Sequence, residues 1–534
     1  MPDNSVSRRH FFFGSLLAGA VPIGGFGSTP SLGALGYKSP NEKLNIASIG
    51  AGGRAASDIQ GCASENMVAF ADPDSNTAAN TFNRYEKAAK YTDFRKMLDK
   101  EAKNIDAVIV AIPDHMHATA ALWAMERGKH VYVEKPLTRT VAEARMLTEA
   151  AAKYKVATQM GNQGYSNEGT RIAAEIIWSG EIGNVTEVHA WTNRPIWPQG
   201  VTEIPPESPV PSTLDWDLWL GIAKARPYAA APPAGAGGGF GGGGNRPGFY
   251  NPFNWRGFFD FGCGALGDMA CHILGSVNMA LLLTAPTSVE VISQEGKSPF
   301  QFPKKSVTRF EFPARGPMPP VKVFWYDARS DAAFRPPDLP EGEPLIGGAG
   351  AFGSSGQAFS GTGAVPGGGG GGRGRGRGAG APGGAPDSAA AAPAEAPGAP
   401  AARGGRGGGG GGGGGSQSNG AVFVGEKGVI TTDTYANNCR LLPLARHNEY
   451  RVPPQMLTRS PGHHRDWLRA CRGGDPACSN FSVAGPFTEW IVLGALALHF
   501  EGKLEWDSAK MKITDNAEAN KYLKPEVRKG WSLT

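Results

Sequence analysis

The sequence has few cysteines, and they lack the spacing of a metal site. Six are present, and none forms a Cys-x-x-Cys pair or a zinc-finger pattern: Cys62, Cys263, Cys271, Cys439, Cys471 and Cys478. A structural metal ion is therefore not expected. Cys471 and Cys478 are near enough in sequence for a disulfide in an oxidising compartment, and unpaired thiols are an equally good interpretation.

The sequence also lacks an excess of charge on its folded part. The net charge is +5, but five arginines against Asp387 and Glu395 give the segment 347–420 a charge of +3. Arg8 and Arg9 against Asp3 add +1, which leaves about +1 for the remainder. Such a balance does not favour nucleic acid or an anionic membrane as a partner, and it indicates a small molecule instead.

No hydrophobic run is long enough to span a bilayer. The uncharged stretch from Phe11 to Ala20 covers ten residues, whereas a membrane helix needs roughly 20. It follows Ser7-Arg8-Arg9-His10, and this order is typical of a twin-arginine export signal. We expect residues 1–40 to be signal and linker, the protein to be periplasmic or otherwise extracytoplasmic, and no stable membrane anchor to exist. An accidental Arg-Arg pair is the alternative.

Short apolar runs alternate with helical spacing in the first part of the chain. Buried strands are predicted at 44–49, 67–71, 107–112, 130–133 and 156–160, with amphipathic helices at 76–90, 115–127 and 141–153. Strands separated by helices indicate βαβ units and a parallel sheet. Residues 41–160 are therefore predicted to form an α/β domain of the Rossmann type.

The pattern changes after residue 161, where strand candidates come in groups and several alternate apolar with polar residues. This favours a predominantly antiparallel sheet with one solvated face, so residues 161–505 are predicted to form an α+β substrate domain, followed by a tail at 506–534. Low-complexity segments at 229–248 and 347–420 interrupt this domain, and the second holds 32 of the 77 glycines. We expect both to be disordered loops, and the sheet to mediate homo-oligomerisation.

A glycine-rich turn follows the first predicted strand. Gly50-Ala51-Gly52-Gly53-Arg54-Ala55 fits G-x-G-x-x-A at the start of a helix, where glycine allows a tight turn and a pyrophosphate can lie at the helix amino terminus. Asp72 ends the second strand, 20 residues after Gly52, where a carboxylate accepts hydrogen bonds from ribose hydroxyls. A carboxylate repels a 2′-phosphate, so NAD is favoured. NADP stays possible because Arg84 is near in sequence.

Further motifs follow in a fixed order. They are Pro113-Asp114-His115-Met116-His117 after a central strand, Glu134-Lys135-Pro136 after another, and Asp268-Met269-Ala270-Cys271-His272 in the second domain. Together with the glycine turn this ordered set resembles the Gfo/Idh/MocA family of oxidoreductases, and the resemblance runs from Lys43 to Thr534 apart from the two low-complexity segments. It implies that Pro113, His117, Glu134 and Lys135 contact the cofactor, and that the bond before Pro136 is cis.

The resemblance implies that Lys135 lies beside the nicotinamide and the reacting carbon, where an ammonium can stabilise a developing alkoxide. Asp268 and His272 are four residues apart on a helix predicted over 266–278, so both project from one face. His272 can then take the proton of a substrate hydroxyl, while Asp268 orients the substrate or stabilises the imidazolium. The alternative is that the helix is capped and His272 has only a structural role, with its hydrogen bonds satisfied inside the protein. Arg256 and Gln163 are expected to bind substrate.

These features predict an NAD(P)-dependent oxidoreductase that acts on a secondary alcohol or ketone of a sugar, polyol or glycoside. The alternatives are a redox-neutral glycosidase that oxidises, eliminates, adds water and re-reduces, and a non-catalytic sugar-binding protein on the same fold. Because the twin-arginine route exports folded proteins, we expect the cofactor to be tightly bound.

Overall fold

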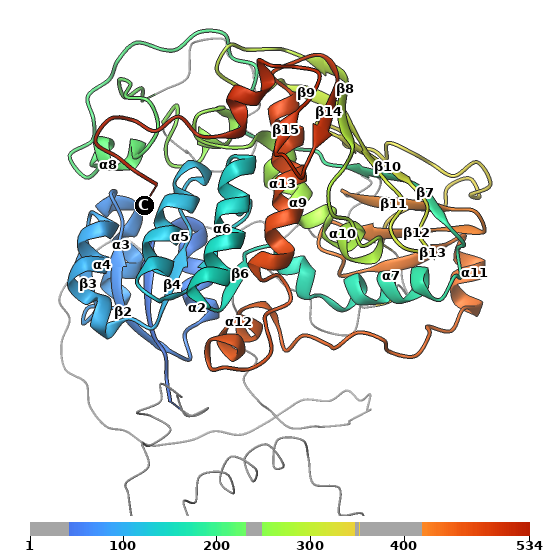
Figure 1. Cartoon of the computed structure of the whole chain (residues 1–534), viewed down its shortest axis with the longest axis horizontal. Coiled ribbons are helices and arrows are strands. Elements are labelled where there is room, and N and C mark those ends of the chain that lie inside the picture. The colour runs from blue at the N-terminus through green and yellow to red at the C-terminus, as the bar shows by residue number, and fades with distance from the viewer. Residues whose placement is uncertain (1–41, 231–247, 348–351, 353–418, 534) are drawn as a thin grey trace, which may run out of the picture.

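The computed structural model describes residues 42–230, 248–347, 352 and 419–533. They form two domains side by side, one around a parallel sheet and one around a larger mixed sheet (Figure 1). The predicted export signal and most of the two low-complexity segments lie outside these residues. In the described part of the chain, no helix is long and apolar enough to cross a membrane.

The first domain has a six-stranded parallel sheet in the order β3-β2-β1-β4-β5-β6. The strands are β1 (Asn45–Ile49), β2 (Asn66–Ala71), β3 (Ala89–Tyr91), β4 (Ala107–Val110), β5 (His130–Val133) and β6 (Thr158–Met160), and the helices are α2 (Gly53–Gly61), α3 (Ser75–Arg84), α4 (Phe94–Glu101), α5 (His117–Glu126) and α6 (Val141–Tyr154). The strand order reverses beside β1, and open α/β sheets bind ligands there, at the carboxyl ends of the strands. The predicted Rossmann arrangement is confirmed.

One helix of this domain is shorter than its sequence pattern predicts. The pattern extends it from 76 to 90, whereas α3 ends at Arg84 and β3 follows. A strand of three residues is too short to show an alternation of apolar and polar side chains, so its signal is lost in the preceding helical spacing.

Aspartate caps fix the loops at the carboxyl edge of this sheet. The side chain of Asp74 accepts hydrogen bonds from the backbone N–H groups of Asn76 and Thr77, where α3 begins. Asp93 accepts one from the N–H of Arg95, where α4 begins. Such caps satisfy N–H groups that a helix leaves unpaired, so the loops after β2 and β3 are held in defined positions.

The second domain has a nine-stranded sheet in the order β13-β12-β11-β7-β10-β9-β8-β14-β15. Its strands are β7 (Val185–Trp191), β8 (Ser288–Glu295), β9 (Lys305–Phe312), β10 (Val321–Tyr326), β11 (Gly420–Gly425), β12 (Gly428–Asp433), β13 (Cys439–Leu442), β14 (Gly502–Asp507) and β15 (Lys512–Ile513). Among the described strands of this sheet, only β7 and β10 pair in parallel. The predominantly antiparallel sheet is therefore as predicted.

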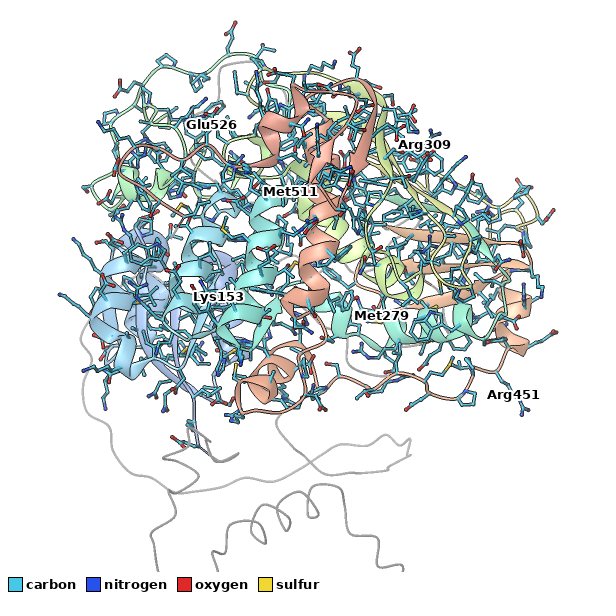
Figure 2. All side chains as sticks on the ribbon, in the orientation of Figure 1. Lys153, Met279, Arg309, Arg451, Met511 and Glu526 are labelled. Atoms are coloured by element: carbon cyan, nitrogen blue, oxygen red, sulfur yellow. The ribbon has the colours of Figure 1, made fainter. Side chains whose placement is uncertain are left out.

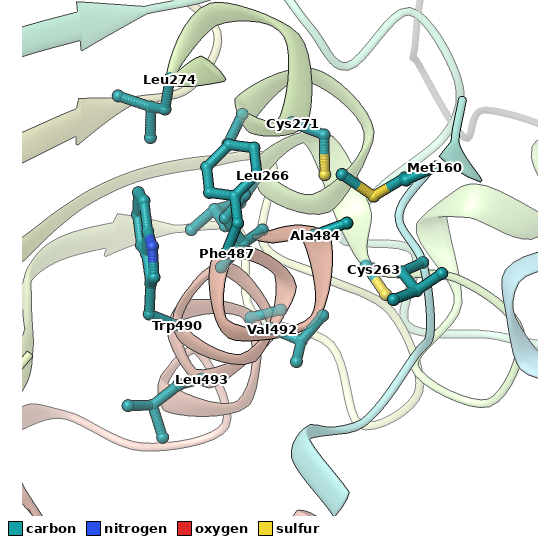
Figure 3. Close-up of a cluster of buried hydrophobic side chains, with 14 of the residues drawn as sticks. Met160, Cys263, Leu266, Cys271, Leu274, Ala484, Phe487, Trp490, Val492 and Leu493 are labelled. Atoms are coloured by element: carbon teal, nitrogen blue, oxygen red, sulfur yellow. The ribbon is translucent and has the colours of Figure 1, made fainter. Parts of the chain in front are cut away.

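Helices cover one face of this sheet and join it to the first domain. They are α7 (Glu168–Trp178), α9 (Gly264–Ile273), α10 (Gly275–Ala280) and α13 (Phe481–Ala497), while α8 (Trp216–Leu220), α11 (Leu444–Glu449) and α12 (His463–Cys471) lie outside this layer. Side chains fill the space between the ribbons (Figure 2). In the close-up, Phe487 and Trp490 of α13 meet Leu266 of α9, with Met160 of the first domain nearby (Figure 3). One continuous core thus connects both domains.

The chain after residue 505 is part of the second domain and not a separate tail. The predicted boundary falls inside β14, which pairs with β8, and Trp506 pairs with Ile513 of β15. Both side chains are buried. Because β14 pairs with a strand far away along the chain and β15 has only two residues, a local sequence pattern does not reveal them.

Two further differences concern helices. The predicted helix over 266–278 is two helices, because α9 ends at Ile273 and α10 begins at Gly275. In addition, α12 packs on the first domain, where Trp467 and Leu468 join a core cluster with Tyr132. The carboxyl-terminal part of the chain therefore completes the amino-terminal domain.

Part of the outer face of the large sheet is covered by the chain itself. Leu339 and Leu345 pack on Trp191 and Val422 of the sheet. This segment leads toward the second low-complexity stretch, whose predicted bounds include structured residues. Phe352 forms a bridge to Cys439, and Gly420 is the first residue of β11. All six cysteines, Cys471 and Cys478 among them, are free thiols.

Candidate active site

A cavity of about 640 Å³ opens at the carboxyl edge of the parallel sheet, between the two domains. Most of the predicted site residues line it: Gly50, Gly52, Gly53, Arg54, Asp72, Pro113, Glu134, Lys135, Gln163, Arg256 and His272. Asp268 contacts this set, whereas His117 lies away from the cavity wall. The structure thus brings together residues that are more than 200 positions apart in the sequence.

The glycine turn has the shape that a dinucleotide requires. A Cβ atom on Gly50 would lie 2.3 Å from the carbonyl oxygen of Ala111, and one on Gly52 would lie 2.3 Å from Cγ2 of Thr77. These two glycines therefore permit close packing of the turn on β4 and α3. Gly53 has nothing within 4 Å and begins α2 at the cavity, so the free N–H groups of this helix can receive a pyrophosphate.

Asp72 connects the glycine turn with the loop after β2. Its Oδ2 accepts a hydrogen bond from the N–H of Ala51 and its Oδ1 from the N–H of Asp74, both at 2.9 Å. Burial raises the pKa of this carboxyl to about 6. Each oxygen keeps acceptor capacity for a ribose hydroxyl. Arg84 lies over the ring of Tyr85 and does not line the cavity.

Arg54 and Glu134 form an ion pair at the floor of the cavity. The Nε of Arg54 donates to Oε1 of Glu134 at 2.9 Å, and its NH2 donates to Oδ1 of Asp58 at 2.9 Å. Burial alone would raise the pKa of Glu134, but the charges of Arg54 and Lys135 lower it below its usual value. Gln163 also donates to Glu134, at 2.9 Å. Arg54 and Gln163 thus hold Glu134 ionised beside Lys135.

His117, for which a cofactor contact is predicted, does not line the cavity. Its Nδ1 lies 2.8 Å from the carbonyl oxygen of Pro136 and its Nε2 lies 2.8 Å from that of Ile112. The side chain is buried, and both nitrogens are occupied by backbone groups. His117 therefore fixes the two loops that carry Pro113 and Lys135. The peptide bond between Lys135 and Pro136 is cis, as the resemblance implies.

Lys135 makes an ion pair across the two domains. Its Nζ donates to Oδ1 of Asp268 at 2.7 Å and to the carbonyl oxygen of the same residue at 2.9 Å. The guanidinium of Arg256 lies 4.4 Å from the ring centroid of Phe253 and 4.3 Å from that of Trp255, and its Nε donates to the same carboxylate at 3.2 Å. One carboxylate thus holds two cations at the substrate end of the cavity.

These contacts determine the charge states of the pair. Burial would raise the pKa of Asp268, but Lys135 and Arg256 outweigh it and hold the pKa well below its usual range. Burial would likewise lower the pKa of Lys135, and Asp268 raises it above the ordinary value. At neutral pH the lysine is therefore an ammonium and the aspartate a carboxylate.

His272 is neutral and has an unused ring nitrogen. Its Nδ1 is buried and has no hydrogen-bond partner. Burial, followed by the charge of Lys135, lowers the pKa of this histidine to about 3. The ring of Tyr435 lies against it, with ring centroids 4.8 Å apart. A neutral imidazole in the cavity is able to accept a proton, while the carboxylate of Asp268 acts on it only through its charge.

Several cavity residues escape the sequence motifs. Tyr435 comes from the loop after β12, and Trp531 from the end of the chain, and neither belongs to a recognisable pattern. Trp219 lines the cavity and is backed by Trp216, with ring centroids 4.8 Å apart. Asp114 belongs to the motif at 113–117, and burial raises the pKa of its carboxyl to about 7. Among the described residues, no cluster of His, Cys, Asp or Glu has the geometry of a metal site.

Residues 44–162 match the oxidoreductase family with an NAD-binding Rossmann fold that is known as Gfo/Idh/MocA. These residues are the first domain, which carries the glycine turn, Asp72 and Glu134-Lys135-Pro136. The part of the chain that matches this family is thus the whole parallel-sheet domain, with its NAD-binding Rossmann fold.

Curated relatives are similar over part of their length. The chain is 28% identical to levoglucosan dehydrogenase of Pseudarthrobacter phenanthrenivorans over 134 residues, 24% of this chain and 33% of that protein. It is 31% identical to inositol 2-dehydrogenase of Salmonella typhimurium over 138 residues, 26% and 40% of the two chains. It is 30% identical to glycosyl hydrolase family 109 protein 1 of Shewanella sp. strain MR-4 over 191 residues, 31% and 41%. The matches thus span well under half of each relative.

A solved structure shows the same two-domain fold. The WlbA dehydrogenase from Chromobacterium violaceum, in complex with NADH and UDP-GlcNAcA, superposes with a TM-score of 0.50 at 13% identity. The superposition covers 88% of this chain and 98% of the other. The likeness therefore extends over both domains of the fold.

Proposed function

We propose that this chain transfers a hydride between NAD and a secondary alcohol or ketone of a sugar, polyol or glycoside. The observation that carries the proposal is the juxtaposition of the Lys135 ammonium and the neutral His272 in a cavity that the dinucleotide turn also lines. The dehydrogenases among the relatives, which are named for a sugar derivative and a polyol, support the substrate class.

Residues at one end of the cavity bind the dinucleotide, and residues at the other end act on the substrate. Bound NAD supplies the hydride acceptor. The amino terminus of α2 at Gly53 holds the pyrophosphate, and Asp72 holds a ribose. At the other end His272 takes the hydroxyl proton of the substrate on an imidazole nitrogen, and Lys135 donates a hydrogen bond from Nζ to the substrate oxygen as negative charge develops on it. Asp268 keeps Lys135 protonated and in place.

A glycosidase without net redox change is the second candidate, and the similarity to a family 109 glycosyl hydrolase favours it. The same oxidation would come first, and would be followed by elimination of the leaving group, addition of water and return of the hydride. The decisive experiment incubates the purified protein with aryl glycosides and with free sugars. NADH absorbance with free sugars supports the dehydrogenase, phenol release without net NADH supports the glycosidase, and neither signal over a broad panel contradicts both.

We further propose that the protein is exported by the twin-arginine route and retains its NAD. An exported enzyme that released NADH in each cycle would depend on free cofactor outside the cytoplasm, so retention and regeneration in place is the simpler solution. Retention through purification requires a dissociation constant near or below about 1 nM. The mature protein is purified from the periplasm without added cofactor and denatured, and the supernatant is assayed for NAD. A cofactor-free protein that needs stoichiometric NAD for each product contradicts this proposal.

We also propose that the protein forms a homo-oligomer through the uncovered part of the large sheet. The part of the sheet left uncovered by the segment around Leu339 and Leu345 carries charged side chains such as Glu290 and Arg309 on β8 and β9. Size-exclusion chromatography with light scattering tests it. A monomer at micromolar concentration would contradict an interface on this sheet.

A further inference from the structure

The last described residues of the chain form a segment that crosses from the second domain to the first. After the short helix Ala519–Leu523 of the second domain, residues 524–533 run toward the edge of the first domain where α4 begins (Figure 1). Glu526, labelled in Figure 2, pairs with Lys224 at 2.7 Å. We call residues 524–533 the C-terminal clasp.

The clasp is fastened at Arg528. The backbone N–H of Arg528 donates to the carbonyl oxygen of Ile222 at 2.9 Å, and its Nε donates to that of Gly221 at 3.0 Å. Its guanidinium also forms an ion pair with Asp217 and donates to the carbonyl oxygen of that residue at 3.0 Å. These contacts attach the clasp to α8 and the loop behind it.

Beyond this attachment, Trp531 reaches the first domain. The guanidinium of Arg95 lies 4.1 Å from the centroid of the Trp531 ring. Arg95 is itself held by Asp93, with its Nε 3.0 Å from Oδ1 and its NH2 2.8 Å from Oδ2. The guanidinium of Arg528 lies 6.0 Å from the centroid of the same ring, and Trp531 also lines the cavity.

This part of the cavity lies beyond Asp72 as seen from the glycine turn. It is lined by Pro73 and Asp74 after β2, by Thr92 and Phe94 after β3, and by Leu218 of α8. If the pyrophosphate lies at α2 and the ribose at Asp72, the base of the dinucleotide extends over the loops after β2 and β3. Trp531 then meets the base and not the nicotinamide, because Lys135 and His272 are at the opposite end.

We propose that Trp531 stacks on the adenine of the bound dinucleotide and that the C-terminal clasp closes this end of the site. This inference rests on the proposed function only in taking NAD as the ligand. The indole offers a rigid aromatic face for a purine, and Arg95 fixes it from behind. Release of the dinucleotide then requires the clasp to detach from Asp217 and Ile222, so the clasp slows dissociation.

The test compares Trp531→Ala with Trp531→Phe, which keeps an aromatic face, and with Val527→Ala, which changes an exposed clasp residue that does not line the cavity. NADH bound to each protein is chased with excess NAD, and its fluorescence gives the dissociation rate. Loss of a base–aromatic stack weakens binding about tenfold. We expect dissociation about tenfold faster for Trp531→Ala, a small change for Trp531→Phe, and none for Val527→Ala.

Nicotinamide mononucleotide, which has no adenine, separates stacking from a general disturbance. Its affinity should be the same for the wild type and Trp531→Ala, whereas a loss equal to that of NAD would overturn the proposal. Arg528→Ala, which leaves the indole in the sequence but removes the fastening, should also speed NADH dissociation. Unchanged NADH dissociation in both Trp531→Ala and Arg528→Ala would overturn the clasp. A wild type that binds neither NAD nor ADP-ribose would instead contradict the proposed function.

Discussion

At the scale of single residues, the site combines three groups whose charge states are set by one another. Asp268 is ionised because two cations contact it, and Lys135 is protonated because Asp268 contacts it. The resulting positive charge helps to keep His272 neutral. A buried ammonium can stabilise a developing alkoxide, and a neutral imidazole has a lone pair that can receive a proton.

Substitution of either group should affect turnover and leave the cofactor in place. We expect Lys135→Ala and His272→Ala each to lower kcat by roughly 100-fold or more, the scale on which positioned acid–base groups act. Bound NAD, measured after denaturation, should stay near the wild-type amount because neither residue holds the pyrophosphate or the ribose on Asp72. Lys103→Ala, which changes an exposed lysine, is the control. Near-normal turnover in one of the site variants would remove that residue from the mechanism.

Asp72 should determine which dinucleotide binds and how binding depends on pH. We expect Asp72→Ala to weaken NAD more than NADP, because it removes both the acceptor for the ribose hydroxyls and the charge that repels a 2′-phosphate. Arg84→Ala, which changes a residue away from the cavity, should leave the ratio of the two affinities unchanged. Equal losses for NAD and NADP in Asp72→Ala would show that the ribose is held elsewhere.

The pKa of Asp72 gives the sign of the pH effect. The folded value of about 6 lies above the ordinary 3.8, so this group stabilises the cofactor-free protein below pH 3.8 and that contribution is lost as the pH rises through 6. Ribose hydroxyls donate to the ionised form, so NAD affinity should fall as the pH is lowered through about 6. Titration calorimetry with NAD across this range, on wild type and Asp72→Ala freed of bound cofactor, measures it. A pH dependence that persists in the variant would assign the effect to another group.

At the scale of elements, the glycine turn depends on contacts with its neighbours. An added Cβ on Gly52 meets Cγ2 of Thr77 at 2.3 Å and the carbonyl oxygen of Thr77 at 2.4 Å, so α2 and α3 would have to separate. We expect Gly52→Ala to cost about 1–3 kcal/mol of unfolding free energy, as overpacking does. Gly53→Ala has open space but a φ of +52°, and should cost about 1 kcal/mol. Urea denaturation measures both, and a Gly52→Ala protein as stable as wild type would contradict the close packing.

Local sequence patterns predict some positions in the site and miss others. Glu134-Lys135-Pro136 follows a buried strand directly, so a local pattern is enough to place Lys135 at the carboxyl edge of the sheet. His117 belongs to a motif equally near in sequence, but its two carbonyl partners depend on how the loops fold back, which spacing does not encode. Trp467 and Trp531 reach the first domain from the far end of the chain, and such contacts leave no periodic signal.

At the scale of the whole molecule, the active site depends on the relative position of the two domains. Lys135 comes from the first domain and Asp268 from α9 of the second, and their contact is 2.7 Å. Elsewhere between the domains, Arg145 of α6 donates two hydrogen bonds to Glu489 of α13, at 2.7 and 2.6 Å. The two parts of the cavity are thus held by contacts both inside the site and between helices outside it.

The second low-complexity segment should contribute little to this arrangement. Its flanks are attached to the large sheet: Phe352 exchanges backbone hydrogen bonds with Cys439 at 2.9 and 3.0 Å, and Gly420 begins β11. No described residue from 347 to 420 lines the cavity. We therefore expect that replacing residues 353–418 by a short Gly/Ser linker has little effect on the site.

We expect this deletion to leave kcat unchanged and to shift Tm by only a few degrees. Loop closure changes by about 0.6 kcal/mol for each doubling of loop length, and 1 kcal/mol corresponds to about 2–4 °C in a domain of this size. A longer deletion that also removes Phe352 and Gly420 is the control, and it should lower Tm further because it takes away a bridge and the first pair of β11 with β12. Calorimetry and the activity assay on both variants give the answer. A large loss of activity in the shorter deletion would show that residues 353–418 take part in the site, whereas equal Tm values for the two deletions would show that the bridge at Phe352 carries no stability.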